Sequence, residues 1–296
     1  MLRNLISLSS VARSFPVLGM ATMLLGTGVN AASALDITTS TDGTALANAL
    51  VSPFPGVSIS NVNLVGGSTS AGFFSNGMSS GIGLDEGIIL TSGDAQLAPG
   101  PNVTDNATLD FGGAGDADLD TLTTDSTFDA TTLTFDITTT TGDIFIQYAF
   151  ASEEYNEFVN SSFNDVFGFF VDGTNIALIP GTNTPVTINN VNNNLNSQFY
   201  NDNDPSDLGT PTPFDIEYDG FTNVFTATAT GLVPGQTYTL KLGVADTADF
   251  SLDSAVFISA VADVPPPPPG TPEPATVAGL VALGAFGATL KRRKNS

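Results

Sequence analysis

Short runs of alternating apolar and polar residues recur along most of the chain and constrain its fold more than any other feature. Leu133, Phe135 and Ile137 alternate with Thr and Asp, and Ile144, Ile146 and Tyr148 begin a second run of the same kind. A period of two places the apolar side chains on one face of a β-strand. About ten such runs, separated by Gly-, Asn- and Pro-rich turns, predict an all-β chain: a β-sandwich of short strands with long acidic loops. A division into two domains near residue 130 is the alternative.

Two turns and one helix are predicted within this body. Residues 138–142 lie between two alternating runs and predict a hairpin loop, and Asp172-Gly173 predicts a type I′ turn between two apolar runs. Residues 41–51 have the apolar spacing of a short helix, with Asp42 as its candidate N-cap. Further strands are expected at 57–59, 62–64, 86–91, 166–171, 175–179, 186–191, 214–218, 224–228, 237–244 and 255–261.

The first 34 residues have the features of a secretory signal peptide. Arg3 and Arg13 form a basic region, residues 17–29 are apolar, and Ala34 ends a small-residue cleavage site. We therefore predict a signal peptide over 1–34, with a signal helix that is removed by signal peptidase after Ala34. A buried N-terminal helix is the alternative.

The C-terminal end has the composition of a membrane anchor. Residues 264–271 form a Pro-rich linker, residues 275–290 carry no charge, and a basic cluster follows at Lys291, Arg292, Arg293 and Lys294. A helix of 16 residues spans about 24 Å, a little less than a ~30 Å hydrocarbon core, and a basic flank is typical of the cytoplasmic side. We predict a single transmembrane helix over 275–290, which holds an exported domain (35–263) at the membrane.

This tail resembles the PEP-CTERM sorting signal, which combines a Pro-Glu-Pro motif, a short transmembrane helix and a terminal basic cluster. The matching segment is 272–296, with Pro272, Glu273 and Pro274 as the motif, although Thr271 stands where the family often has Val. The resemblance implies a transient inner-membrane anchor that an exosortase cleaves. The protein is then released or transferred to the outer surface, often in a Gram-negative bacterium that makes exopolysaccharide. A permanent single-span anchor is the alternative.

The charge distribution excludes several classes of function. Between residues 35 and 274 the only basic residue is Lys241, against all 30 acidic residues, for a net charge of −29. Such a body repels nucleic acid and anionic membranes and attracts cations. The chain has no Cys and no His, which excludes disulfides, thiolate chemistry, zinc sites of the usual ligands and His-based triads. Chemistry based on hard cations or on carboxylates remains.

Three acidic groups are candidates for a hard cation, and calcium is the cation expected. The first is Glu153, Glu154 and Glu157 with Asp165; the second is Asp246, Asp249 and Asp253; the third is Asp116, Asp118 and Asp120. In a helix the three glutamates would share a face, whereas in a strand Glu154 would point away from the other two. None of the groups is an EF-hand, although calcium suits oxygen-rich loops at strand ends. Acidic loops that merely keep the surface soluble are the alternative.

A glycosidase would use one glutamate as the acid and another as the nucleophile or base. Adjacent glutamates rarely converge on one sugar bond, and the chain has no Trp to form a sugar platform. We therefore expect no enzymatic activity. A carbohydrate-acting enzyme that uses Glu153 or Glu154 and a small-ligand binding module remain the alternatives.

Six segments of the chain resemble the choice-of-anchor L domain: Tyr148–Val159, 163–170, 175–182, 185–192, 218–222 and 252–257. The resemblance implies a surface or extracellular module delivered by one of several anchoring tails, with no established reaction. We therefore expect a structural or adhesive module of the cell surface or extracellular matrix. Its expected partners are signal peptidase and exosortase during export, the membrane as a transient anchor, and exopolysaccharide or matrix components.

Overall fold

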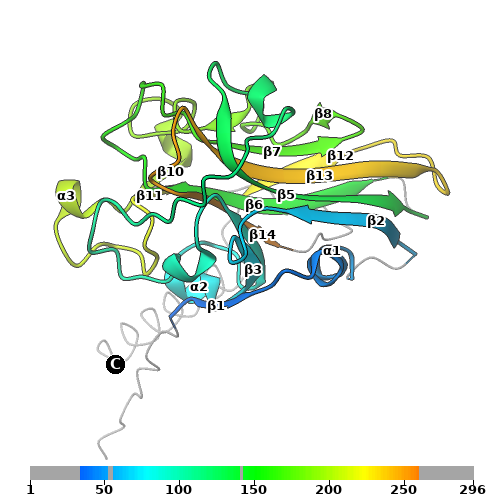
Figure 1. Cartoon of the computed structure of the whole chain (residues 1–296), viewed down its shortest axis with the longest axis horizontal. Helices are drawn as coiled ribbons and strands as arrows, with labels where there is room; N and C mark the ends of the chain where they lie inside the picture. Colours follow the sequence, from blue (N-terminus) through cyan, green and yellow to red (C-terminus); the bar gives the residue numbers. More distant parts are fainter. Residues whose placement is uncertain (1–33, 53–55, 141–142, 260–296) are drawn as a thin grey trace, which may run out of the picture. The chain divides into compact units, whose positions relative to one another are not determined.

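The computed structural model describes residues 34–52, 56–140 and 143–259, and within them two antiparallel β-sheets face each other (Figure 1). This confirms the prediction of a mainly β, sandwich-like fold. The predicted signal peptide (apart from Ala34), the linker 264–271 and the sorting tail 272–296 lie outside the described residues.

Within the described residues, the first sheet has the strand order β1-β3-β4-β14-β6-β11-β10, with β12 also paired to β6. Its strands are β1 (Asp36–Thr39), β3 (Ala71–Ser75), β4 (Gly87–Thr91), β6 (Ile144–Ser152), β10 (Tyr200–Asp202), β11 (Gly220–Thr222), β12 (Phe225–Ala229) and β14 (Ser254–Ser259). The second sheet has the order β2-β5-β13-β7-β8, with β9 paired to β7. Its strands are β2 (Ser58–Val65), β5 (Thr127–Thr138), β7 (Val166–Val171), β8 (Thr174–Asn175), β9 (Val186–Thr187) and β13 (Thr237–Thr247).

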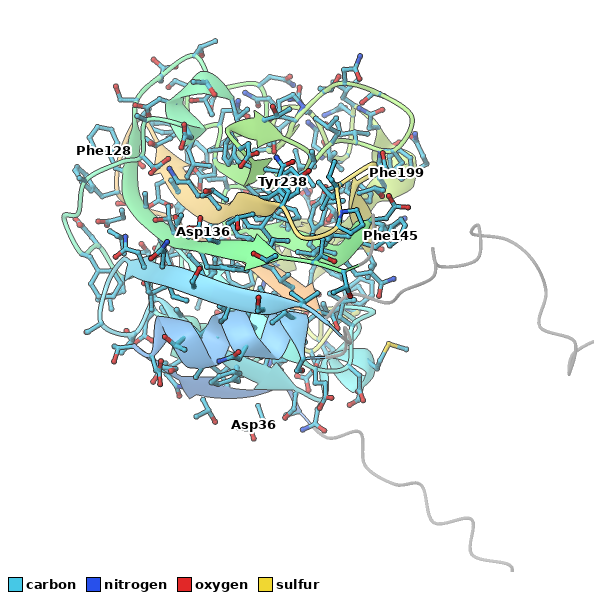
Figure 2. The ribbon with its side chains drawn as sticks, turned by 90° about the vertical axis from the view of Figure 1, so that its right-hand side faces the viewer. Asp36, Phe128, Asp136, Phe145, Phe199 and Tyr238 are labelled. Atoms are coloured by element: carbon cyan, nitrogen blue, oxygen red, sulfur yellow. The ribbon has the colours of Figure 1, made fainter. Side chains whose placement is uncertain are left out.

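The helices are short. They are α1 (Gly43–Val51), α2 (Gly77–Ser80) and α3 (Pro205–Leu208), with 3₁₀ turns at Ala95–Leu97, Leu119–Thr121 and Ser197–Phe199. The predicted first helix is confirmed, and the Asp42 carboxylate caps it by accepting a hydrogen bond from the Ala45 N–H. Its apolar face (Leu46, Ala47 and Leu50) is buried, and α1 lies between β2 and β1 (Figures 1 and 2).

No helix in the described ranges combines the length and the apolar character that crossing a bilayer requires. The segment predicted to span the membrane, 275–290, is not among those ranges.

One of the two predicted turns is confirmed. Asp172 and Gly173 both have positive φ (46° and 78°), as a type I′ turn requires, and Val171 pairs with Thr174 on either side. Such a turn favours Gly because a left-handed backbone has no steric cost without a Cβ.

The predicted hairpin at 138–142 is wrong. Strand β5 pairs with β2 and β13 in the second sheet, whereas β6 pairs with β14, β11 and β12 in the first. The connection therefore crosses from one sheet to the other. Both strands have one apolar face, and these faces meet across the sandwich, where Phe135 and Ile146 share one buried core. Alternation alone does not distinguish pairing within a sheet from packing between sheets.

The predicted strand at 214–218 is also wrong. This segment is irregular, and its apolar residues Phe214, Ile216 and Tyr218 pack on the outer face of the first sheet. Most of the predicted strand 175–179 is likewise irregular after Asn175. The strands β1, β3, β10 and β11 were not predicted. Phe74 of β3 packs edge-to-face on Phe257 of β14.

The strand ends bring the acidic segments to one end of the sandwich. Ser152, the last residue of β6, pairs with Ser254, the first of β14, and with Gly220, the first of β11. In the second sheet Val166, the first residue of β7, pairs with Ala245 near the end of β13. We call this end the acidic end; β10, β11 and α3 lie at the left of Figure 1.

Candidate metal centre

The adjacent glutamates Glu153 and Glu154 continue the alternation of β6 and point to opposite faces of the first sheet. Tyr148 and Phe150 face the second sheet, whereas Ala149 and Ala151 pack on the outer face. Glu154 therefore joins the inter-sheet side and Glu153 the outer side. Both side chains are buried. The two glutamates lie in a bend directly after β6, and Glu157 lies in the turn that follows, so the stretch is neither the helix nor the strand considered from the sequence.

On the inter-sheet side, Glu154, Asp165 and Asp246 form a group that we call the inter-sheet carboxylates. Asp165 precedes β7 and Asp246 lies near the end of β13, so the two are neighbours across the strand pair. Asp165 is satisfied: its Oδ1 accepts from the Thr247 N–H (2.8 Å) and its Oδ2 from the Ser254 hydroxyl (2.8 Å). Glu154 Oε2 and both carboxylate oxygens of Asp246 are buried without a hydrogen-bond partner.

Burial makes the ionised form of these three residues unfavourable. It raises the pKa of Glu154 to about 10 and that of Asp165 to about 8, and it raises the pKa of Asp246 well above its ordinary value. The nearby Asp165 carboxylate adds to the rise at Glu154 and at Asp246. A buried carboxylate without a donor is costly unless it is protonated or bound by a cation.

On the outer side, Asp219, Glu153 and Asp253 form a row that we call the acidic row. Each lies one residue beyond the paired residues Gly220, Ser152 and Ser254, and all three are buried. Burial is the main cause that raises the pKa of Asp219 to about 8 and that of Asp253 to about 7. Burial also raises the pKa of Glu153 well above its ordinary value, and the neighbouring Asp219 adds to that rise.

A segment without regular secondary structure, residues 102–113, covers the acidic row, and we call it the strap. It donates hydrogen bonds to each carboxylate in turn. Asn102 Nδ2 binds Asp219 Oδ1 (2.7 Å), and the Ala107 N–H binds Glu153 Oε2 (3.2 Å). The Thr108 hydroxyl and the Leu109 N–H bind the two oxygens of Asp253 (3.0 and 2.9 Å).

The strap continues to Asp129 in β5, whose two carboxylate oxygens accept the N–H groups of Phe111 and Gly113. These hydrogen bonds hold the strap against the carboxyl groups. They add no positive charge, so the carboxyl groups repel one another once they ionise.

The only basic side chain in the described part of the chain is Lys241, and it serves a different group. Its Nζ lies 2.6 Å from carboxylate oxygens of both Asp116 and Asp118. Asp120, the third member of that predicted group, accepts hydrogen bonds from the Thr127 N–H and hydroxyl (both 2.7 Å). The group at 116–120 is therefore already compensated within the chain, and the acidic end has no basic side chain of its own.

Asp219 of the acidic row also belongs to a third set of converging carboxylates, namely Asp105, Asp204 and Asp219, which we call the outer triad. One carboxylate oxygen from each lies within 4.8 Å of the others. Asp204 and Asp219 are fully buried and Asp105 is exposed. At an effective dielectric constant near 20, two ionised carboxylates at this separation repel by about 3 to 4 kcal/mol. The outer triad could therefore hold a metal ion.

The seven predicted ligands do not form one site. Glu154, Asp165 and Asp246 lie on the inter-sheet side, where the partly exposed Asp249 is an electrostatic neighbour of Glu154 and Asp165. Glu153 and Asp253 lie in the acidic row, beneath the strap. Glu157 is exposed and accepts a hydrogen bond from the Ser206 hydroxyl (3.0 Å).

The outer triad was not predicted. Asp202 and Asp204 have the spacing of two EF-hand ligands, but Pro205 directly after them interrupts that pattern. In the structure Asp204 is the N-cap of α3, and its Oδ1 accepts from the Ser206 N–H (2.7 Å). An Asp followed by Pro is a usual start for a helix and could have identified this role. No local signal places Asp105 or Asp219 beside it.

All of these groups offer oxygen ligands only, which suits a hard divalent cation such as calcium. The unpartnered oxygens of Glu153, Glu154, Asp204, Asp219 and Asp246 provide the acceptors that such an ion requires. On both faces of the first sheet, the type of ligand atom therefore fits calcium. The nitrogen and sulfur ligands of the usual zinc sites are lacking.

Two facing antiparallel sheets with an acidic end define the chain as a β-sandwich module rich in buried carboxylates. The sequence profile of the choice-of-anchor L domain matches residues 36–262, and the chain belongs to that family. Membership implies a sorted surface protein. No curated protein and no solved structure shows a significant match to the chain.

Proposed function

We propose that the protein is a non-catalytic structural or adhesive module of the cell surface or extracellular matrix, with an acidic end that calcium holds together. The observation that carries the calcium part is the set of buried carboxylate oxygens without partners, in a body whose single basic side chain is engaged elsewhere. The family supports the surface location. Calcium at extracellular concentrations fills even weak oxygen sites.

A non-catalytic role is supported by the positions of Glu153 and Glu154. Each is 1% exposed, and their side chains point to opposite faces of one sheet, so they do not flank a common substrate position. Two surface cavities of about 450 and 360 Å³ are lined by neither glutamate. A glycosidase needs both carboxyl groups beside the same bond.

Delivery through the sorting route completes the proposal. Signal peptidase would remove residues 1–34, and the transmembrane helix 275–290 would hold the module at the inner membrane until an exosortase recognises Pro272, Glu273 and Pro274. The module would then reach the outer surface or the medium, where exopolysaccharide or matrix components are its expected partners. The sequence of the tail supports this route.

Intact mass spectrometry of the surface-associated or secreted protein tests this delivery in a host that has an exosortase. We expect a mature form that starts after Ala34 and lacks Lys291 to Lys294. Glu273→Ala should leave the basic cluster attached and the protein in the membrane fraction, because the recognition motif is lost. Glu86→Ala, an exposed acid of the body, is the matched control. Surface protein that still carries residues 291–294 would show that the tail is a permanent anchor.

A further inference from the structure

The outer triad joins three segments that are far apart in the sequence. Asp105 belongs to the strap, Asp204 caps α3 after β10, and Asp219 precedes β11. Asn102 fixes the strap at this point, since its Nδ2 donates to both Asp219 Oδ1 (2.7 Å) and the Asn203 carbonyl (3.1 Å). These neutral contacts bring the Asp105 carboxylate to two buried carboxylates without any positive charge between them.

The hydrogen bonds of the triad leave one oxygen free on each buried member. Asp204 Oδ1 accepts from Ser206, and Asp219 Oδ1 accepts from Asn102, whereas Oδ2 of both residues is buried with no partner. Both residues have no exposed surface. An acceptor that is buried and unsatisfied in this way indicates a ligand that the protein alone does not provide.

Glu153, which directly follows β6 of the first sheet, supplies a further carboxylate oxygen without a hydrogen-bond partner. It is an electrostatic neighbour of Asp219, and its Oε1 is buried without a partner while Oε2 accepts from the strap at Ala107. Asp105 is exposed and leaves the opposite side open to water, from which an ion can enter and keep part of its hydration. Carboxylates from loops together with water are the ligands that calcium accepts.

From this arrangement we infer that Asp105, Asp204 and Asp219 bind one calcium ion, with Glu153 beside them, and that the ion fastens the strap to the loops at β10 and β11. The inference rests on the proposed function, because it names the place where calcium supports the acidic end. The ion converts the repulsion among the three carboxylates into a cross-link between the strap and the first sheet.

Tyrosine-sensitised terbium emission can test this site, because Tb³⁺ replaces Ca²⁺ at oxygen ligands and the chain has no Trp. Tyr200 lies against Gly220, the neighbour of Asp219, and its ring is 4.8 Å from that of Tyr155. Titration of the chelator-treated full-length chain in mild detergent should give saturable emission, which Ca²⁺ displaces at lower concentration than Mg²⁺. Tyr200→Phe should lower the emission intensity and leave the Tb³⁺ affinity in place.

The triad variants then locate the ion. Asp204→Asn with Asp219→Asn should weaken Tb³⁺ binding at least tenfold, and Asp105→Asn should weaken it severalfold. Since Asp105 is exposed, its substitution tests the site even if the double variant folds poorly, which circular dichroism would reveal. Asp85→Asn, an exposed acid outside the group, is the control and should bind as the wild type does.

The outcomes separate this site from the wider proposal. Unchanged Tb³⁺ affinity in both the Asp105→Asn and the double variant overturns the triad as the site. If emission is instead lost in Asp246→Asn, calcium support stands and the ion belongs to the inter-sheet carboxylates. If the wild type shows neither emission nor a calcium-dependent melting temperature, both the site and the calcium part of the proposed function fail.

Discussion

In saturating calcium the purified protein is expected to melt about 5 to 11 °C higher than in chelator. An ion present at 100 times its dissociation constant stabilises the folded state by about 2.7 kcal/mol. For a domain of this size each kcal/mol raises the melting temperature by about 2 to 4 °C. The reason is specific to the native fold, because only the folded chain gathers carboxylates from distant strands around one ion. Thermal melting followed by circular dichroism, with calcium or with chelator, measures the effect.

The substitution Asp246→Asn should have opposite effects on stability in chelator and in calcium. In chelator at pH 8 the variant should be more stable than the wild type, since burial raises the pKa of Asp246 and the folded wild type must keep that carboxyl protonated, whereas an amide needs neither a proton nor a cation there. On addition of calcium, the melting temperature of the variant should rise less than that of the wild type if the inter-sheet carboxylates bind the ion. Asp85→Asn should behave as the wild type in both conditions. Identical melting of the wild type with calcium and with chelator would contradict the proposed calcium support.

Without calcium, the protein should lose stability as the pH rises from about 4 to about 8. Burial raises the pKa of Asp165 and Asp219 to about 8, while the unfolded chain releases these protons near pH 4. Between these values the folded state holds more protons than the unfolded state, so the free energy of unfolding falls with rising pH. Each proton retained contributes about 1.4 kcal/mol per pH unit. The loss due to these two residues levels off above pH 8.

Urea unfolding at pH 5 and pH 8 in chelator measures this dependence. Glu154→Gln should make the fall of the free energy of unfolding with pH less steep. Burial raises the pKa of Glu154 to about 10, and the amide removes a proton that the folded state would retain and the unfolded state would release. Calcium should reduce or abolish the decline, since the ion binds the ionised carboxylates. A metal-free midpoint that is higher at pH 8 than at pH 5 would mean that the carboxylates are ionised and stabilised by other means.

The fold class was predictable because strand alternation depends only on local sequence. The Asp172-Gly173 turn and the Asp42 cap were predictable for the same reason: each follows from the backbone preference or hydrogen bond of one or two residues. The hairpin at 138–142 was not, because strands β5 and β6 bury their apolar faces equally well in one sheet or in two. Which partner a strand takes depends on long-range packing.

The candidate site was predictable only in part. The acidic segments at the ends of β6 and β13 were recognised, and the structure brings them to the same end of the sandwich. The separation of Glu153 from Glu154 follows from the strand period once β6 is known to continue through Ser152. The strap was missed because its position depends on backbone N–H groups, such as that of Leu109, which have no signature in the sequence.

Calorimetric titration of calcium into the chelator-treated protein at pH 7, repeated in two buffers of different ionisation enthalpy, tests the central claim most directly. The claim is that calcium replaces protons on the buried carboxylates of the acidic end. We therefore predict saturable binding with release of at least one proton per ion, seen as a binding enthalpy that differs between the buffers. No binding at millimolar calcium, or binding without proton release, would contradict it.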